Sequence, residues 1–199
     1  EVTSAEILSW YSSGAIRLLA GCAPCQPFST YNQGKDTTKD KKWPLLYHFS
    51  RLIKEVEPEL VTMENVPEVI RHKVYQDFIE ELQSLGYEVF SKEVICTQYG
   101  IPQTRKRHVV LASKIGKISL ISPTHEIPVT VKDTIGSLEQ LRAGEKSNND
   151  PLHVAANLSE INLKRIKHSK PGGTWRDWPE NLRAECHKKD SGKSYPSVY

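Results

Sequence analysis

Residues 58–67, with the sequence PELVTMENVP, set the order of elements in this chain. The apolar run Leu60 to Met63 predicts a buried strand. Before it, apolar residues repeat at helical spacing from Leu45 to Val56, and Pro58 ends that helix. After it, the same spacing predicts a helix from Val74 to Leu85. The centre of the chain is therefore predicted to be a strand flanked by two helices.

The pattern continues on both sides of this centre. A short helix is predicted over 4–13 and a buried strand over 16–21. Two further strands are predicted over 89–96 and 108–112, and their short connection allows them to pair as a hairpin. Alternating helices and apolar strands imply an α/β sheet whose faces are covered. Active residues of such sheets gather beyond the carboxyl ends of the strands.

The character of the sequence changes after Ser113, where Pro, Gly, Asn and Ser become frequent. Helices are predicted over 131–141 and 158–168, and a loop over 172–179. Trp175 and Trp178 in that loop are interpreted as a structural aromatic pair; the alternative is that they contact DNA together with Arg176. We place a domain boundary near Ser119, between residues 1–118 and residues 119–199.

Composition excludes few classes of protein. The 199 residues carry a net charge of +3, which permits a nucleic-acid partner without requiring one. No apolar stretch approaches the length of a membrane span, so no membrane partner is expected. Four cysteines are too few for a disulfide framework, so a cytoplasmic location is expected.

The first candidate functional residue is Cys25, which follows the 16–21 strand in a turn between Pro24 and Pro27. A cysteine presented in this way can act as a thiolate nucleophile. The alternative, a buried cysteine acting as a small hydrophobe, is expected for Cys22 and Cys96. Cys22 and Cys25 also form a C-x-x-C pair, which allows a thioredoxin-like redox centre. No metal site is expected, because no second close cysteine pair is present.

Two further candidates carry charge. Glu64 ends the strand of residues 60–63, where partial burial suits a proton donor; a solvated or capping glutamate is the alternative. Gln103, Arg105 and Arg107 alternate on an expected extended segment and would share one face. Two guanidinium groups on one face suit a phosphate, a carboxylate or a base carbonyl, although a charged sheet edge is common.

Taken together, these three sites resemble the signature of the DNA (cytosine-5)-methyltransferases of bacteria and phages. That signature has a Pro-Cys-Gln loop, then Glu-Asn-Val, then Gln-x-Arg-x-Arg. Here these are residues 24–26, 64–66 and 103–107, with matching extensions at 27–29 and 98–102. Each motif alone is weak, and three in order are specific. The resemblance implies part of a Rossmann-like class I methyltransferase sheet over about residues 1–113. A partial, irregular target-recognition region follows.

The resemblance also implies a chemistry. Cys25 would add to C6 of a cytosine flipped out of double-stranded DNA, and S-adenosylmethionine would supply the methyl group to C5. Glu64 would contact N3 and the exocyclic amine, Arg107 would contact O2, and Arg105 would lie near the nucleophile. These four residues are the predicted catalytic group. Residues predicted to bind the cofactor are Pro24, Gln26 and Leu45, and residues predicted to bind DNA are Ser29 and Gln103. The resemblance also implies that residues 29–42, which include the charged stretch 35–42, form a loop that closes over the DNA, with lysines that could meet phosphate.

The chain also departs from the family pattern. The glycine-rich Phe-x-Gly-x-Gly motif that holds the cofactor is missing, as are the family's final motifs. We therefore expect a fragment with little or no activity by itself, monomeric when complete. A cognate restriction endonuclease is a candidate partner, and a nucleoid-associated location is expected. Two alternatives remain open: a thioredoxin-like oxidoreductase using Cys22 and Cys25, and a non-catalytic DNA-binding fragment of a split methyltransferase.

Overall fold

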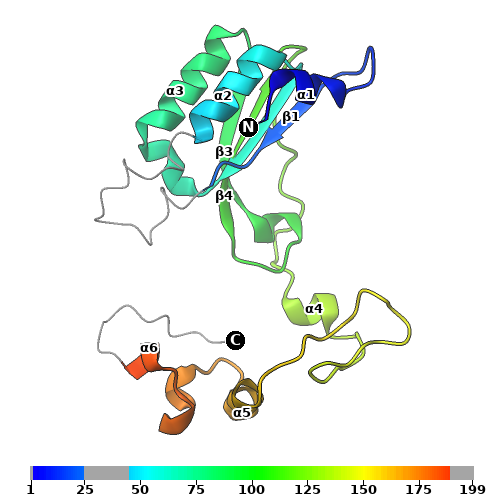
Figure 1. Cartoon of the computed structure of the whole chain (residues 1–199), viewed down its shortest axis with the longest axis vertical. Helices are drawn as coiled ribbons and strands as arrows, with labels where there is room; N and C mark the ends of the chain where they lie inside the picture. Colours follow the sequence, from blue (N-terminus) through cyan, green and yellow to red (C-terminus); the bar gives the residue numbers. More distant parts are fainter. Residues whose placement is uncertain (1, 25–44, 189–199) are drawn as a thin grey trace. The chain divides into compact units, whose positions relative to one another are not determined.

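The computed structural model describes residues 2–24 and 45–188. They form two compact units, residues 1–136 and 137–199, which are described separately. The first unit holds a four-stranded sheet in the order β1-β2-β4-β3 (Figure 1). Its strands are β1 (Leu18–Gly21), β2 (Leu60–Asn65), β3 (Glu88–Ile95) and β4 (Lys106–Ser113). β1 and β2 are parallel, and the two remaining pairs are antiparallel.

Helices and 3-10 turns connect the strands. The first unit contains α1 (Ser4–Ser9), α2 (Leu45–Val56), η2 (Pro67–Arg71), α3 (Lys73–Ser84), η3 (Cys96–Tyr99) and α4 (Val131–Ile135). The second contains α5 (Glu160–His168), η4 (Trp175–Asp177), η5 (Glu180–Leu182) and α6 (Glu185–Lys188). None of the helices within residues 2–24 and 45–188 combines the length and the apolar character that crossing a bilayer requires.

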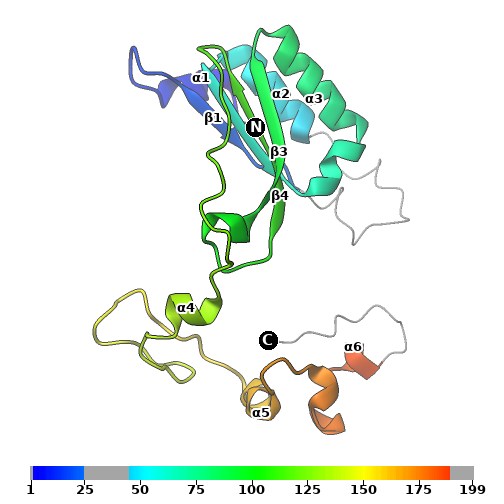
Figure 2. The same cartoon turned by 180° about the vertical axis from the view of Figure 1, so that it is seen from behind.

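The predicted helix–strand–helix centre is confirmed. α2 and α3 lie side by side against one face of the sheet (Figures 1 and 2). Phe49 of α2 stacks on Phe78 of α3 with ring centroids 5.9 Å apart. Gly86 follows the end of α3 with φ 83°, and Tyr87 N–H donates to the Leu82 carbonyl at 3.1 Å, so a glycine caps this helix.

A single hydrophobic core lies between these helices and the sheet. Every second residue of β2 is buried, and the residues between them are only half-buried. The expectation that both faces are covered is therefore wrong for the described residues, since only the Val61 and Met63 side of β2 packs under helices. The core residues are Leu46, Ile53, Val61, Met63, Val69, Val74, Tyr75, Phe78, Leu82, Tyr87, Val110 and Ala112.

Several predicted boundaries need correction. The first helix ends at Ser9 instead of Ser13, with Trp10 as its C-cap, and a separate turn at Gly14 with φ 73° follows. β1 is not a buried strand: it lies at an edge of the described sheet, and Leu18 is 51% exposed. The predicted hairpin is confirmed by the antiparallel pairing of β3 with β4. Glu64 and Asn65 belong to β2 and do not follow it.

Arg17 ties the start of β1 to the start of β2. Its side chain donates to both carboxylate oxygens of Glu59 at 2.8 and 3.0 Å, and to the Val56 and Glu57 carbonyls at 2.9 and 2.8 Å. The hydrogen bond from Arg17 lowers the pKa of Glu59 from 4.5 to about 2. The ionised carboxylate is therefore part of what holds these strands in register.

This ion pair predicts a pH dependence of stability. Because the folded-state pKa of Glu59 lies below its unfolded value, its contribution is complete above about pH 4.5 and is lost as the pH falls towards about 2. Glu59→Gln should therefore lower Tm near neutral pH, and the difference from the wild type should shrink on acidification. Thermal unfolding of both proteins across that range checks this, and a difference independent of pH would contradict it.

The second unit is organised around an aromatic cluster. Trp175 and Trp178 are 8% and 4% exposed and pack with Leu182, so the predicted structural pair is confirmed. The Arg176 guanidinium lies 5.1 Å from the Trp175 ring centroid. Arg165 lies 5.6 Å over Trp178 and also donates to the Leu182 carbonyl at 2.7 Å. These cations cover the rings and link α5 to the turns that follow.

Two predictions for the irregular part are only partly met. α5 confirms the helix expected over 158–168, whereas the helix expected over 131–141 stops at Ile135, just before Gly136. The loop expected over 172–179 contains the 3-10 turn η4. The boundary predicted near Ser119 concerns a functional region and stays a prediction; it falls inside the first compact unit.

Candidate active site

Glu64 lies near the carboxyl end of β2 and is the centre of a charged cluster. Strand alternation turns Asn65 and Met63 towards the helices and leaves Glu64 on the opposite face. Its side chain is 38% exposed, so the expected partial burial is confirmed. The neighbouring strand β4 brings the arginines to it, because Glu64 and Val109 are register partners.

Both predicted arginines meet this carboxylate. Arg107 Nε lies 2.5 Å from Glu64 Oε1, and Arg105 Nη2 lies 4.0 Å from the same oxygen. The prediction that the two guanidinium groups share a face is thus confirmed. The extended segment expected from Gln103 is wrong: β4 begins only at Lys106, after both Gln103 and Arg105, and the Gln103 N–H donates to the Ile101 carbonyl at 2.7 Å.

The segment that follows β1 lies against the same cluster. Cys22 was expected to be buried, but it is exposed, and its thiol donates to Glu64 Oε2 at 3.1 Å. Cys96 is half-buried. The thiol of Cys22 turns outward because it extends β1 on the face that carries Glu64, away from the helices.

Asn65 holds this segment in place. Asn65 is 1% exposed, and its amide donates to the Ala23 carbonyl at 3.0 Å while its own oxygen accepts from Val66 N–H at 2.9 Å. A buried amide with these two hydrogen bonds fixes the backbone two residues before Cys25. Cys25, Gln26 and Ser29 themselves lie outside the described residues, as does the charged loop at 35–42.

A buried pair supports the neighbouring strand. The His108 ring and the Tyr75 hydroxyl are 2.7 Å apart, and His108 is the register partner of Asn65. Burial lowers the pKa of His108 and raises the pKa of Tyr75, so both groups are held neutral near pH 7. This neutral pair packs beneath the charged cluster without adding charge to it.

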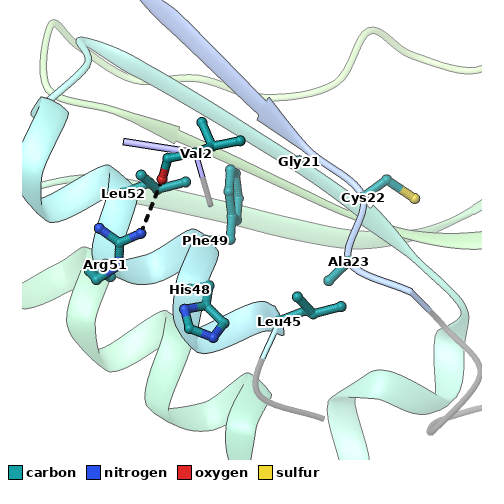
Figure 3. Close-up of a pocket in the computed structure, with 9 residues that line it drawn as sticks. All are labelled: Val2, Gly21, Cys22, Ala23, Leu45, His48, Phe49, Arg51 and Leu52. Carbon is teal, nitrogen blue, oxygen red and sulfur yellow. Dashed lines mark hydrogen bonds between the residues drawn. The ribbon is translucent and has the colours of Figure 1, made fainter. Parts of the chain in front are cut away.

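A pocket of about 640 Å³ opens between the end of β1 and α2 (Figure 3). That volume suits a small organic ligand or cofactor. The predicted cofactor residue Leu45 lines it, whereas Pro24, half-buried, is not among its lining residues. The lining residues are Val2, Gly21, Cys22, Ala23, Leu45, His48, Phe49, Arg51 and Leu52.

The lining residues that α2 adds beyond Leu45 were not predicted, although helical spacing indicates them. His48, Phe49 and Leu52 follow Leu45 at intervals of three, four and seven residues, which places them on one side of α2. Gly21 completes the wall on the strand side. A Cβ at Gly21 would lie 2.5 Å from the Phe49 ring, so only glycine lets that ring close against the strand.

The arrangement joins two chemical environments at the ends of β1 and β2. One is a mostly apolar pocket, and the other is a carboxylate held by two guanidinium groups and a thiol. Two cations against one anion leave a positive charge, which stabilises thiolates and attracts phosphates.

The sequence of this chain matches those of known proteins. A family model described as C-5 cytosine-specific DNA methylase matches residues 5–198. The type II methylase M.HgiDII of Herpetosiphon aurantiacus is 51% identical over 204 residues, covering all of this chain and 57% of that protein. The type II methyltransferase M1.HphI of Haemophilus parahaemolyticus is 34% identical over 176 residues, covering 84% of this chain and 46% of that protein.

A solved structure shares the fold. A protein described as a prophage-encoded DNA modification methyltransferase (E. coli) matches with a TM-score of 0.54 and 23% identity, over 90% of this chain and 50% of that one. The mixed α/β sheet is thus of the methyltransferase type. The chain spans about half the length of the curated relatives it matches.

Proposed function

Because the chain belongs to the C-5 cytosine-specific DNA methylase family, we propose that it forms part of an enzyme that methylates C5 of cytosine in double-stranded DNA. The observation that carries this proposal is the cluster of Glu64, Arg105 and Arg107 beside the segment that leads into Cys25. Chain segments more than forty residues apart in sequence meet there. The predicted acid and both predicted cations therefore share one site.

Cys25 is the proposed nucleophile. Cytosine C5 is unreactive towards electrophiles, so the Cys25 sulfur forms a bond to C6 and pushes electrons towards N3 and O2 of the ring. A proton donated to N3 and a cation at O2 stabilise that charge, and we assign these roles to Glu64 and Arg107; N3 returns its proton when the ring is restored. After methyl transfer, loss of the C5 proton and cleavage of the S–C6 bond release the base and restore the thiolate.

The pocket beside α2 is the proposed cofactor site. S-adenosylmethionine supplies an electrophilic methyl group when bound. The residues present fit such a ligand: Leu45, Phe49 and Ala23 give apolar walls, and the cavity of about 640 Å³ opens at Cys22, three residues before the nucleophile. Pro24 and Gln26, which flank Cys25, remain predicted contacts of the cofactor.

The contacts with DNA follow from the proposed reaction. C6 of a stacked cytosine is out of reach, so the target base must flip out of the helix. We assign Arg105 to the backbone of the flipped nucleotide, and Ser29 and Gln103 remain predicted DNA contacts. Residues 119–199 are the proposed start of the target-recognition region. We also propose that the protein is cytoplasmic and that a cognate restriction endonuclease is its partner.

The product of the reaction tests this function. The full-length protein, given DNA and S-adenosylmethionine labelled in its methyl group, should place the label in 5-methylcytosine after digestion to nucleosides. Label in N4-methylcytosine or N6-methyladenine would contradict the proposal, as would unlabelled DNA. The thioredoxin-like alternative predicts disulfide reduction in place of methylation, and membership of the methylase family gives it no support.

A further inference from the structure

Glu64 presents its two oxygens to different partners. Oε1 faces the cations, with Arg107 Nε at 2.5 Å and Arg105 Nη2 at 4.0 Å. Oε2 accepts from the Cys22 thiol at 3.1 Å. A glutamate carboxylate otherwise rotates broadly about its last torsion. The thiol and the Arg107 guanidinium thus each hold a different oxygen of the carboxylate.

The parallel register of β1 and β2 creates this contact. Gly21 and Met63 are register partners, and Cys22 and Glu64 are the next residues along the two strands. Both side chains line a second cavity of about 310 Å³, together with Ala20, Gly21 and Thr62. In Figure 3 the Cys22 sulfur points away from Leu45 and Phe49. The Cys22 thiol therefore points towards the Glu64 carboxylate and away from these two residues of α2.

We propose that Cys22 is a positioning residue for Glu64, which rests on the function proposed above. Its thiol is an uncharged donor, so it fixes Oε2 without adding another cation to the two already at Oε1. The carboxylate then meets the flipped base in a fixed orientation. A pre-oriented group accelerates the chemical step more than it strengthens binding of DNA.

Two substitutions separate this role from a structural one. In the full-length protein, Cys22→Ala removes the donor, and Cys22→Ser keeps it. Loss of one hydrogen bond of ordinary strength predicts a drop of about 3- to 10-fold in the single-turnover rate for Cys22→Ala. Cys22→Ser should stay within about twofold of wild type, and both should keep Kd for DNA within about twofold. Cys96→Ala is the matched cysteine control.

A double-mutant cycle tests that Cys22 acts through Glu64. In a Glu64→Gln background, Cys22→Ala should lower the rate by no more than about twofold further. The inference is overturned if Cys22→Ala equals wild type, if Cys22→Ser is as slow as Cys22→Ala, or if the Cys22→Ala effect is undiminished in the Glu64→Gln background. If the wild-type protein leaves cytosine unmethylated, the proposed function fails instead. The two failures are therefore distinguishable.

Discussion

Cys25→Ala should lower the rate of DNA methylation by the full-length protein by about 10⁴-fold or more. Without the thiolate no bond forms at C6, and C5 stays too poor a nucleophile to accept a methyl group. Methyl transfer to DNA under single-turnover conditions measures the effect. Binding of DNA should persist, because the phosphate contacts do not depend on the thiol.

Cys96→Ala provides the comparison for this experiment. Cys96 is half-buried in η3, and its backbone N–H, which donates to the Arg105 carbonyl at 2.9 Å, is unchanged by the substitution. The methylation rate of the Cys96→Ala variant should stay within about twofold of wild type. Substantial methylation by Cys25→Ala would contradict the role assigned to Cys25.

Glu64→Gln is expected to lower the single-turnover rate by about 10²- to 10³-fold. The amide keeps the size of the side chain but removes the negative charge that Arg107 and Arg105 face at 2.5 and 4.0 Å. It also removes the acid–base function proposed at N3 of the base. The rate at saturating DNA should carry most of the loss, with Kd for DNA changing little.

Glu93→Gln is the matched control for Glu64→Gln. Glu93 lies on β3 and pairs with Lys106 at 3.5 Å, with both side chains about half exposed. Exposed pairs of this kind contribute little, so methylation should stay within about twofold of wild type. An equal loss in the two glutamine variants would show that the effect is general and not specific to the site.

The central helices and strands could be predicted because their signals are local and dense. The apolar spacing of α2 and α3 and the run beginning at Leu60 each lie within one element. The exposure of Leu18 could not be predicted in this way, because it depends on which strand lies at the edge of the sheet. α4 ends at Ile135 with Gly136 as its C-cap, a glycine that a window average over 131–141 conceals.

In the candidate site, too, local signals could be predicted and contacts between distant segments could not. Glu64, Arg105 and Arg107 were predicted from motifs, and the structure brings them together. The contact of Cys22 with Glu64 was missed, since it depends on the register of two strands that are 42 residues apart. The other pocket-lining residues of α2 could be predicted from helical spacing, but only once Leu45 was known to line a cavity.

The most direct test of the central claim is covalent trapping on DNA that carries 5-fluorocytosine at the target site. Fluorine at C5 cannot leave as a proton does, so the bond between enzyme and base persists after methyl transfer. With S-adenosylmethionine present, the account predicts a denaturation-resistant complex of the full-length protein with DNA, in which peptide mapping finds the base on Cys25. A complex that maps to Cys22, or one that Cys25→Ala still forms, would contradict it.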